Sequence, residues 1–288
     1  MDKPAASHYL MCKDYTVSGE LFALVRDEEL QMLRTVPAPA EDRLPEYYKS
    51  ENYISHTDGK RSLFEKCYHM VKRYALKQKL KYINRENPEK GRLLDIGAGT
   101  GDFLLVAKAD GWQAEGIEPN TSARKRAKEK GISLREESDE VFMEDRSGAY
   151  TSITLWHVLE HVPDLHRQIS ELKILLKREG TLFVAVPNFR SYDAEHYKSF
   201  WAAYDVPRHL WHFSPEAIKA VFQQHDMKVI RQIPMKFDAF YVSLLSEKYK
   251  TGKMNFLKAF RLGWRSNRKA ASSGQYSSLI YVIKHANT

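Results

Sequence analysis

The 288-residue sequence lacks most of the features that mark secreted or membrane-spanning chains. Its two cysteines, Cys12 and Cys67, are too few and too far apart for a disulfide framework or a cysteine-rich metal site. No run approaches the ~18 consecutive apolar residues of a transmembrane helix, and the first residues lack the basic start and apolar core of a secretory signal. We therefore expect a soluble, packed protein of a reducing compartment, the cytoplasm.

Acidic residues are missing from one segment. Between Lys248 and Lys269 there are eight lysines and arginines and no aspartate or glutamate, which alone accounts for the net charge of +8. This segment is either a solvated helical face or a surface for an anionic partner, such as nucleic acid, a phosphorylated substrate or a membrane surface. A membrane surface suits the apolar residues that interleave with the charges. These are Phe256, Leu257, Phe260, Leu262 and Trp264.

From Gly91 onward, short apolar runs alternate with helical patterns, which predicts repeated βα units. We expect an α/β fold with a Rossmann-like, seven-stranded, mostly parallel sheet, helices on both faces, and an antiparallel edge formed by the last two strands. Ser214 and Pro215 predict a helix start. The predicted strands are 92–96, 113–117, 132–135, 152–156, 181–186, 228–233 and 278–283, and the predicted helices are 102–110, 122–130, 165–177 and 217–224.

The first part of the chain has a different pattern. Residues 1–60 contain a polar, proline-punctuated stretch, and we interpret them as a small β appendage. Residues 63–82 predict one long helix that packs on the sheet or covers a ligand cleft. A single larger domain is then expected over residues 61–288, with the basic segment at about 248–269 inserted near its end.

Three glycines follow the first predicted strand of that domain, in the spacing Gly97-x-Gly99-x-Gly101. Glycines there let the chain turn sharply and bring backbone N–H groups and a helix N-terminus close to a ligand. A dinucleotide site would have G-x-G-x-x-G instead. The acidic Asp95 just before the loop repels a pyrophosphate but suits a cationic ligand. Glu118, at the end of the second strand, is placed to accept ribose hydroxyls.

These residues resemble the class I S-adenosylmethionine (SAM)-dependent methyltransferases over about residues 91–286. The stretches LWHVLEHV (155–162) and DVPRHLWHFSPEAI (205–218) are similar to the methyltransferase-23, ubiquinone-biosynthesis-like branch. The resemblance implies SAM as cofactor. Backbone atoms of the glycine loop would contact it, Glu118 would contact its ribose, and Ser138 and Asp139 would lie near its adenine. The implied cofactor contacts are Asp95, Gly97, Ala98, Gly99, Gly101, Asp102, Glu118, Pro119, Ser138, Asp139 and Trp156.

The N-terminal segment resembles a zinc ribbon that precedes many such domains. The likeness covers residues 26–30 and 35–39, followed by two tyrosines. In a ribbon, positions 27 and 30 would be cysteines, but this chain has Asp27 and Leu30, and only Cys12 remains as a possible ligand. Tetrahedral structural zinc needs four nitrogen or sulfur ligands. We therefore expect a ribbon-like appendage without zinc.

The motif His157-x-x-Glu160-His161 also occurs in zinc proteases, where a helix presents both histidines. Here it follows a predicted sheet strand, which argues against zinc hydrolysis. Some quinone-pathway relatives have an acid in place of His157 and hold a divalent cation with it and the Glu-His pair. Since this chain has a histidine there, we predict no metal. Glu160 and His161 then either take part in catalysis or orient the loop at the cleft floor.

Methyl transfer needs an aligned nucleophile and exclusion of water, because the sulfonium is already an activated leaving group. A hydroxyl acceptor also benefits from a general base, for which His161 and His209 are the first candidates and His157 the next. Each of them can equally be a structural histidine. An acceptor pocket is expected from four residues, which burial under the N-terminal appendage would explain as well. They are Trp201, Tyr204, Arg208 and Trp211.

The sequence thus predicts a SAM-dependent methyltransferase acting on a small molecule, by O-methylation. A nucleic-acid methyltransferase is one alternative, but those enzymes commonly place Asn/Asp-Pro-Pro-aromatic after the fourth strand, where this chain has Leu155-Trp156-His157. A non-catalytic SAM-binding protein is another. The undamaged glycine loop argues against it, and the glycine spacing argues against a nicotinamide oxidoreductase.

Overall fold

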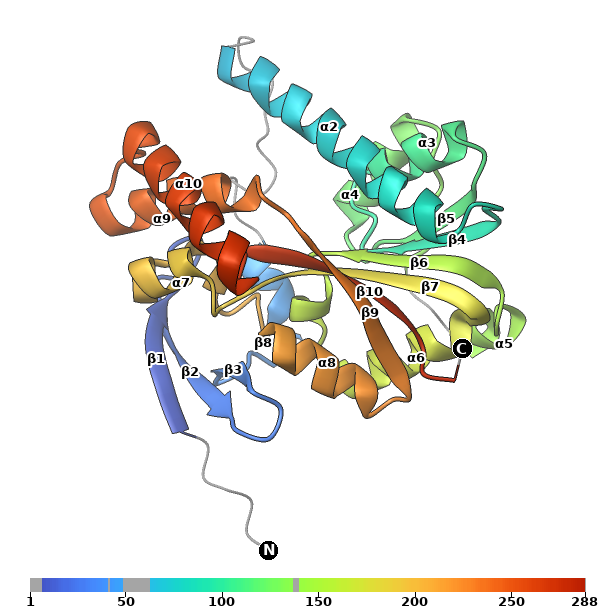
Figure 1. The fold of residues 1–288 in the computed structure, drawn as a ribbon, viewed down its shortest axis with the longest axis horizontal. Helices are drawn as coiled ribbons and strands as arrows, with labels where there is room; N and C mark the ends of the chain where they lie inside the picture. Colours follow the sequence, from blue (N-terminus) through green and yellow to red (C-terminus); the bar gives the residue numbers. More distant parts are fainter. Residues whose placement is uncertain (1–6, 41, 49–62, 137–139, 288) are drawn as a thin grey trace, which may run out of the picture.

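The computed structural model describes residues 7–40, 42–48, 63–136 and 140–287. Figure 1 shows a large twisted sheet with helices on both faces, flanked at one end by a smaller sheet and a pair of long helices. The large sheet has six strands in the order β5-β4-β6-β7-β10-β9, and the smaller one has four in the order β1-β2-β3-β8. The α/β class and the Rossmann-like arrangement are therefore confirmed.

The large sheet is parallel except for one strand. Strands β4, β5, β6 and β7 pair in parallel, whereas β10 runs antiparallel to both β7 and β9. The antiparallel edge predicted from the last two strands is thus present. The bounds of the strands are β4 (Arg92–Ile96), β5 (Gln113–Ile117), β6 (Tyr150–Trp156), β7 (Leu176–Pro187), β9 (Met227–Pro234) and β10 (Ser278–His285).

The prediction of a seventh strand at 132–135 is wrong. In the part of the chain that the structure describes, this segment makes a single parallel bridge, Ile117 to Arg135, beside the edge strand β5. Two backbone hydrogen bonds hold it there: Glu118 N–H donates to Arg135 O at 2.9 Å, and Arg135 N–H donates to Gly116 O at 3.0 Å. Only one residue of this segment is fully buried, Ile132, and Leu134 is partly buried, so little apolar burial extends the pairing.

Helices cover both faces of the sheet, because successive residues of its central strands point to opposite faces and are buried on both. Leu182, Val184 and Val186 of β7 pack into one core with α6 and α8, while Phe183 and Ala185 pack into the other with α2 and α3. Figure 1 shows α2 and α3 on one side of the sheet and α6 and α8 on the other. The bounds are α2 (Leu63–Glu86), α3 (Asp102–Ala109), α4 (Thr121–Glu129), α5 (Glu140–Asp145), α6 (Leu165–Leu175) and α8 (Pro215–Gln223).

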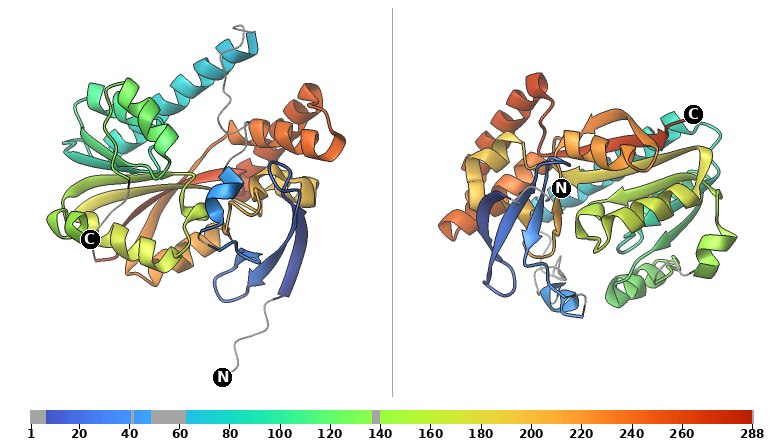
Figure 2. Two further views of the ribbon diagram at one scale, coloured as in Figure 1. Left: turned by 180° about the vertical axis from the view of Figure 1, so that it is seen from behind. Right: turned by 90° about the horizontal axis from the view of Figure 1, so that it is seen from below.

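The N-terminal strands are joined to the larger domain by a shared sheet. β1 (Ser7–Lys13), β2 (Leu21–Asp27) and β3 (Met32–Val36) form an antiparallel meander, and β3 pairs with β8 (Trp211–His212) from the second half of the chain. A short helix, η1 (Leu44–Tyr48), follows. Figure 2 shows these strands beside the loops that lead to β8. The sheet thus gives residues 7–36 a β structure, and the ribbon likeness of this segment remains a proposal.

The residues between β7 and β8 fold as short helices, α7 (Tyr192–Tyr197), η3 (Lys198–Phe200) and η4 (Ala202–Tyr204). The predicted basic insertion is a helical hairpin of α9 (Asp238–Thr251) and α10 (Phe256–Ser273), which projects from one end of the sheet (Figure 1). Within the described residues, no helix has both the length and the apolar character needed to cross a membrane.

Candidate functional site

The glycine loop forms the centre of the candidate site, between β4 and α3. All three glycines have left-handed backbones, with φ of 67° at Gly97, 55° at Gly99 and 74° at Gly101. A Cβ at Gly97 would lie 2.4 Å from Cγ2 of Val158, so the loop that follows β6 packs directly against this turn. No described atom lies within 4 Å of where a Cβ of Gly99 would be. The loop is therefore closely packed on one side and open on the other.

Asp95 lies at the end of β4, just before this loop. Its side chain is 1% exposed, and Oδ1 accepts a hydrogen bond of 2.6 Å from the hydroxyl of Thr154. Burial raises the pKa of Asp95 to about 7, although Thr154 and the cation of Lys79 act in the opposite direction. A carboxylate held in this way is poorly solvated and would be stabilised by a cationic ligand.

Glu118 lies at the end of β5, beside the open face of the loop. Its Oε2 accepts a hydrogen bond of 2.8 Å from the backbone N–H of Gly99, and Oε1 accepts one of 2.8 Å from the N–H of Asn120. The neighbouring Pro119 precedes Asn120, whose side chain caps α4 by accepting from Ala123 N–H at 3.0 Å. The carboxylate is thus fixed in direction at the end of the strand, next to Gly99.

Lys79 is a residue of this site that the sequence pattern did not single out. It comes from α2, the helix expected over the cleft, and its Nζ lies 4.3 Å from the centre of the Trp156 ring. Burial lowers the pKa of Lys79 to about 8, while Asp95 and Asp238 act to raise it. The indole of Trp156 also contacts Phe103, and its Nε1 is buried without a hydrogen-bond partner among the described residues. The cation of Lys79 therefore interacts with Asp95 and lies over the indole of Trp156.

Asp102 is paired with two lysines. It is the first residue of α3, and its carboxylate bonds to Nζ of Lys72 and of Lys130, each at 2.6 Å. These lysines lower the pKa of Asp102 against the effect of its burial. Its visible role is to fasten α2 over the glycine loop. Ala98, also predicted in the cofactor site, lies within the loop and is 9% exposed, and Ser138 and Asp139 lie outside the described residues.

His157 opens the loop after β6, with a left-handed backbone (φ 59°). Its Nδ1 lies 3.4 Å from Oε1 of Glu160, and its Nε2 lies 3.3 Å from Oδ2 of Asp238 on α9. Burial alone would lower the pKa of this imidazole, but the two carboxylates raise it to about 9. His157 is therefore an imidazolium at neutral pH and has no lone pair to act as a base.

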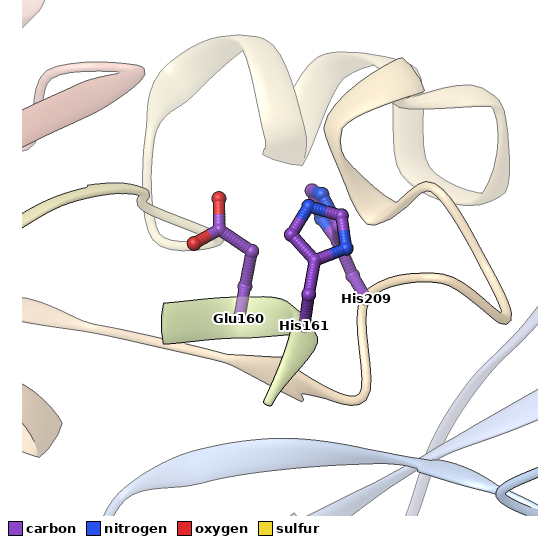
Figure 3. Close-up of side chains that lie close together, drawn as sticks. All are labelled: Glu160, His161 and His209. Carbon is purple, nitrogen blue, oxygen red and sulfur yellow. The ribbon is translucent and has the colours of Figure 1, made fainter. Parts of the chain in front are cut away.

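The side chains of Glu160, His161 and His209 lie close together, as Figure 3 shows. One ligand atom of each lies within 4.8 Å of the others, and the two imidazole rings are 4.5 Å apart. His161 Nδ1 lies 3.0 Å from both the carbonyl of Arg208 and the hydroxyl of Tyr48. Since a carbonyl only accepts, Nδ1 carries the proton in that pair and Nε2 has the lone pair.

His209 is more deeply placed, at 7% exposed. Its Nδ1 lies 2.9 Å from the carbonyl of Ala203, and its Nε2 lies 3.9 Å from Oδ2 of Asp205. Burial and the neighbouring His161 lower the pKa of His209 well below its usual value. His209 is thus a neutral residue whose position is set by backbone contacts.

Glu160, His161 and His209 are a group of described residues whose geometry could hold a metal ion. The carboxylate oxygens of Glu160 are buried, and within the described residues they accept no hydrogen bond. Their charge is balanced at longer range by the imidazolium of His157, at 3.4 Å. The donor set fits a cation, and the imidazolium already supplies one positive charge. The predicted absence of a metal therefore stays a prediction.

Three of the four predicted acceptor residues are buried. Trp201, Tyr204 and Arg208 are 2–3% exposed and pack between the N-terminal strands and the larger domain. Trp201 Nε1 donates to Asp193 at 2.8 Å, and Arg208 pairs with Asp205 and donates to the Tyr47 carbonyl. This is the burial under the N-terminal segment that the sequence left open as the other explanation. Trp211 is half-buried in β8, where its Nε1 donates to Val162 O at 2.7 Å.

Comparison with known proteins is consistent with this geometry. Residues 68–232, more than half of the chain, match the family described as a methyltransferase domain. Ubiquinone biosynthesis O-methyltransferase from Actinobacillus pleuropneumoniae is 35% identical over 107 residues, which cover 34% of this chain and 46% of that protein. The protein of the same name from Coxiella burnetii is 28% identical over 122 residues, 40% of this chain and 52% of that one.

The chain thus spans about half the length of the curated relatives it matches. Among solved structures, geranyl diphosphate C-methyltransferase from Streptomyces coelicolor is similar in fold, with a TM-score of 0.50 at 14% identity, over 73% of this chain and 77% of that one. At this identity the likeness supports the fold alone. The family match carries the assignment: the chain belongs to the methyltransferase domain family.

Proposed function

We propose that the protein methylates a hydroxyl group of a small-molecule acceptor, with His161 as the general base. The observation that carries this proposal is the hydrogen bonding of His161. Its Nδ1 faces the Arg208 carbonyl, so Nε2 is left as the basic nitrogen. A neutral imidazole suits proton removal from a hydroxyl near neutral pH, whereas an amine acceptor needs less help from a base. The names of the curated relatives, both O-methyltransferases, support the same chemistry.

We propose that the residues around the glycine loop hold the cofactor, which supplies an activated methyl group on a sulfonium. Asp95 suits the cationic end of that molecule, and Lys79 suits its carboxylate. Glu118 and the N–H of Gly99 suit the ribose hydroxyls. This N–H donates to Oε2 of Glu118 at 2.8 Å, so both groups lie on the open face of the loop. The Nε1 of Trp156, which is buried and has no hydrogen-bond partner among the described residues, offers one further donor.

The loop from His157 to His161 connects this cofactor site to the proposed base. Val158 touches Gly97, and three residues later His161 is fixed by Arg208 and Tyr48. When bound, the cofactor would supply the methyl group from its sulfonium and would be left as a neutral thioether. Nε2 of His161 would take the proton of the acceptor hydroxyl as that oxygen is methylated, so charge would be conserved.

The test is a panel of small hydroxylated and amino acceptors offered with methyl-labelled SAM. His161→Ala is expected to lower kcat by about 10²–10⁴-fold at saturating SAM. The dissociation constant of SAM, measured by calorimetry, should stay within twofold. His166→Ala, on the exposed surface of α6, is the matched control. Unchanged turnover in His161→Ala, or product methylated at nitrogen, would contradict the proposal.

A further inference from the structure

Helix α10 presents three different faces along its length. Its buried face consists of small or apolar residues that pack toward the rest of the protein, among them Ala259, Leu262 and Ser266. Large apolar side chains follow a second, exposed line, one helical turn apart. They are Phe256, Phe260 and Trp264, which are 55%, 61% and 54% exposed, with Leu257 beside them at 72%.

The third face of α10 is basic. Lys258, Arg261, Arg265 and Lys269 follow one another at intervals of three or four residues, which places them along one side of the helix. The end of α9 and the turn between the helices add Lys248, Lys250 and Lys253, all exposed. These positive charges also act on a neighbouring histidine. Burial lowers the pKa of His196, and the charges of Lys250 and Lys258 lower it further.

Part of this charge is balanced within the protein. Lys258 pairs with Glu247 at 3.0 Å, and Lys269 lies 3.9 Å from the centre of the Tyr192 ring, close to Arg265. The remaining excess is large, since no acidic residue occurs between Lys248 and Lys269. A groove of about 560 Å³ runs between the apolar and basic faces, lined among others by Leu257, Arg261, Trp264 and Arg265.

An exposed apolar line beside a basic line, on a helix without acidic residues, is the arrangement of helices that lie in a membrane interface. A nucleic-acid surface would satisfy the charges, but it would leave the aliphatic Leu257 and the row of phenylalanines in water. We infer that the exposed side of the α9–α10 hairpin binds peripherally to a bilayer rich in anionic phospholipid, with the apolar side chains of α10 at the acyl boundary and the basic residues at the headgroups.

This attachment would bring the candidate site close to the membrane. Helix α9 begins at Asp238, whose carboxylate contacts His157, so the hairpin starts at the site and projects away from the sheet (Figure 1). The exposed Phe237 lies against Tyr74 of α2, with the ring centres 5.7 Å apart. Tyr74 of α2 and Phe237, the residue just before α9, therefore lie together beside the start of the hairpin.

The test is co-sedimentation of the full chain with vesicles of phosphatidylcholine alone and of phosphatidylcholine with phosphatidylglycerol at 7:3, at three salt concentrations. Binding is expected for the mixed vesicles only and should weaken as salt rises. Replacing Lys250, Lys253 and Arg261 together by glutamine should lower partitioning about 100-fold, since each basic residue contributes about fivefold. Leu257→Ser with Phe260→Ser should lower it at least tenfold.

Matched controls lie elsewhere on the surface. Lys125→Gln with Lys128→Gln and Lys177→Gln removes as much charge from exposed positions, and Ile174→Ser removes a 50%-exposed apolar side chain. These should bind as the original protein does. Circular dichroism checks that the hairpin variants are folded.

Equal binding by hairpin and control variants, or no binding to the mixed vesicles, would overturn the inference. A salt-sensitive gel shift with RNA in the absence of vesicle binding would assign the surface to nucleic acid instead, and a dimer that protects Trp264 from a quencher would assign it to a second copy. None of these outcomes depends on methyl transfer.

Discussion

Burial of Asp95 as a charged carboxylate should lower the free energy of unfolding, whereas a neutral side chain at this position should not. The pKa of Asp95 is raised from 3.8 to about 7 by burial. The folded state binds the proton of the Asp95 carboxyl group more tightly than the unfolded state does. The stabilisation that protonated Asp95 contributes is therefore fully present below pH 3.8 and is lost as the pH rises through about 7. A shift of this size corresponds to about 4 kcal/mol, at 1.36 kcal/mol for each pKa unit.

Asp95→Asn removes the ionisation and keeps the shape. An asparagine oxygen can still accept the 2.6 Å hydrogen bond from Thr154. The variant should therefore be more stable than the original protein, by a margin that grows about 1.4 kcal/mol per pH unit between pH 5 and 7 and levels off above. Urea unfolding of the cofactor-free protein at pH 5, 6, 7 and 8 measures this margin.

Asp110→Asn is the matched control with the opposite sign. Hydrogen bonds from Asn84 and Lys90 lower the pKa of Asp110, so its contribution is present above the usual carboxyl pKa and is lost as the pH falls. This variant should be less stable than the original at neutral pH. A margin for Asp95→Asn that does not change with pH would refute the reasoning, because it would show that the carboxyl group is already ionised in the folded protein at pH 5, as it is in the unfolded chain. Calorimetry should also show that the stabilised variant binds SAM more weakly.

The remaining predictions concern the cation and the possible metal. Lys79→Met keeps the side-chain length and removes the charge beside Asp95, so we expect the dissociation constant of SAM to rise about tenfold. Lys81→Met, on the same helix, should change this constant less than twofold. Equal effects of the two substitutions would contradict a role for Lys79. We also predict that the purified enzyme contains less than 0.1 metal atom per chain and keeps its activity after dialysis against EDTA. If EDTA abolishes the activity and Mg²⁺ or Zn²⁺ restores it, the prediction is wrong, and Glu160, His161 and His209 hold a metal.

Much of the fold could be predicted because its elements carry local signals. Ser214 caps α8 by accepting from Ala217 N–H at 3.0 Å, and the long pattern from Leu63 became α2. The third strand failed for a non-local reason. A short apolar run next to the edge of a sheet becomes a strand only if its neighbour offers enough burial, and the segment at 132–135 makes one bridge.

The candidate site was predictable where the backbone defines it and less so where distant side chains meet. The glycine spacing placed the loop, and Glu118 lies beside Gly99 as the strand order requires. Lys79 escaped because a helical pattern shows which face is apolar, but not which of several lysines lies over a given strand end. The role of the aromatic residues near 201–211 could not be decided from the sequence either, because stacking on a ligand and burial under another segment need the same residue types.

The N-terminal strands take part in the site more directly than an appendage would. Thr35 of β3 donates through its hydroxyl to the His209 carbonyl at 2.6 Å, and its N–H donates to Leu210 O at 3.0 Å. Tyr48 contacts Nδ1 of His161. The backbone of His209 and the side chain of His161 are thus both held from the N-terminal segment, while the cofactor loop is set from β4 and α2. A change in how β3 pairs with β8 should then shift these histidines relative to the glycine loop without touching either, so we expect the N-terminal segment to have a positioning role in the proposed methyl transfer.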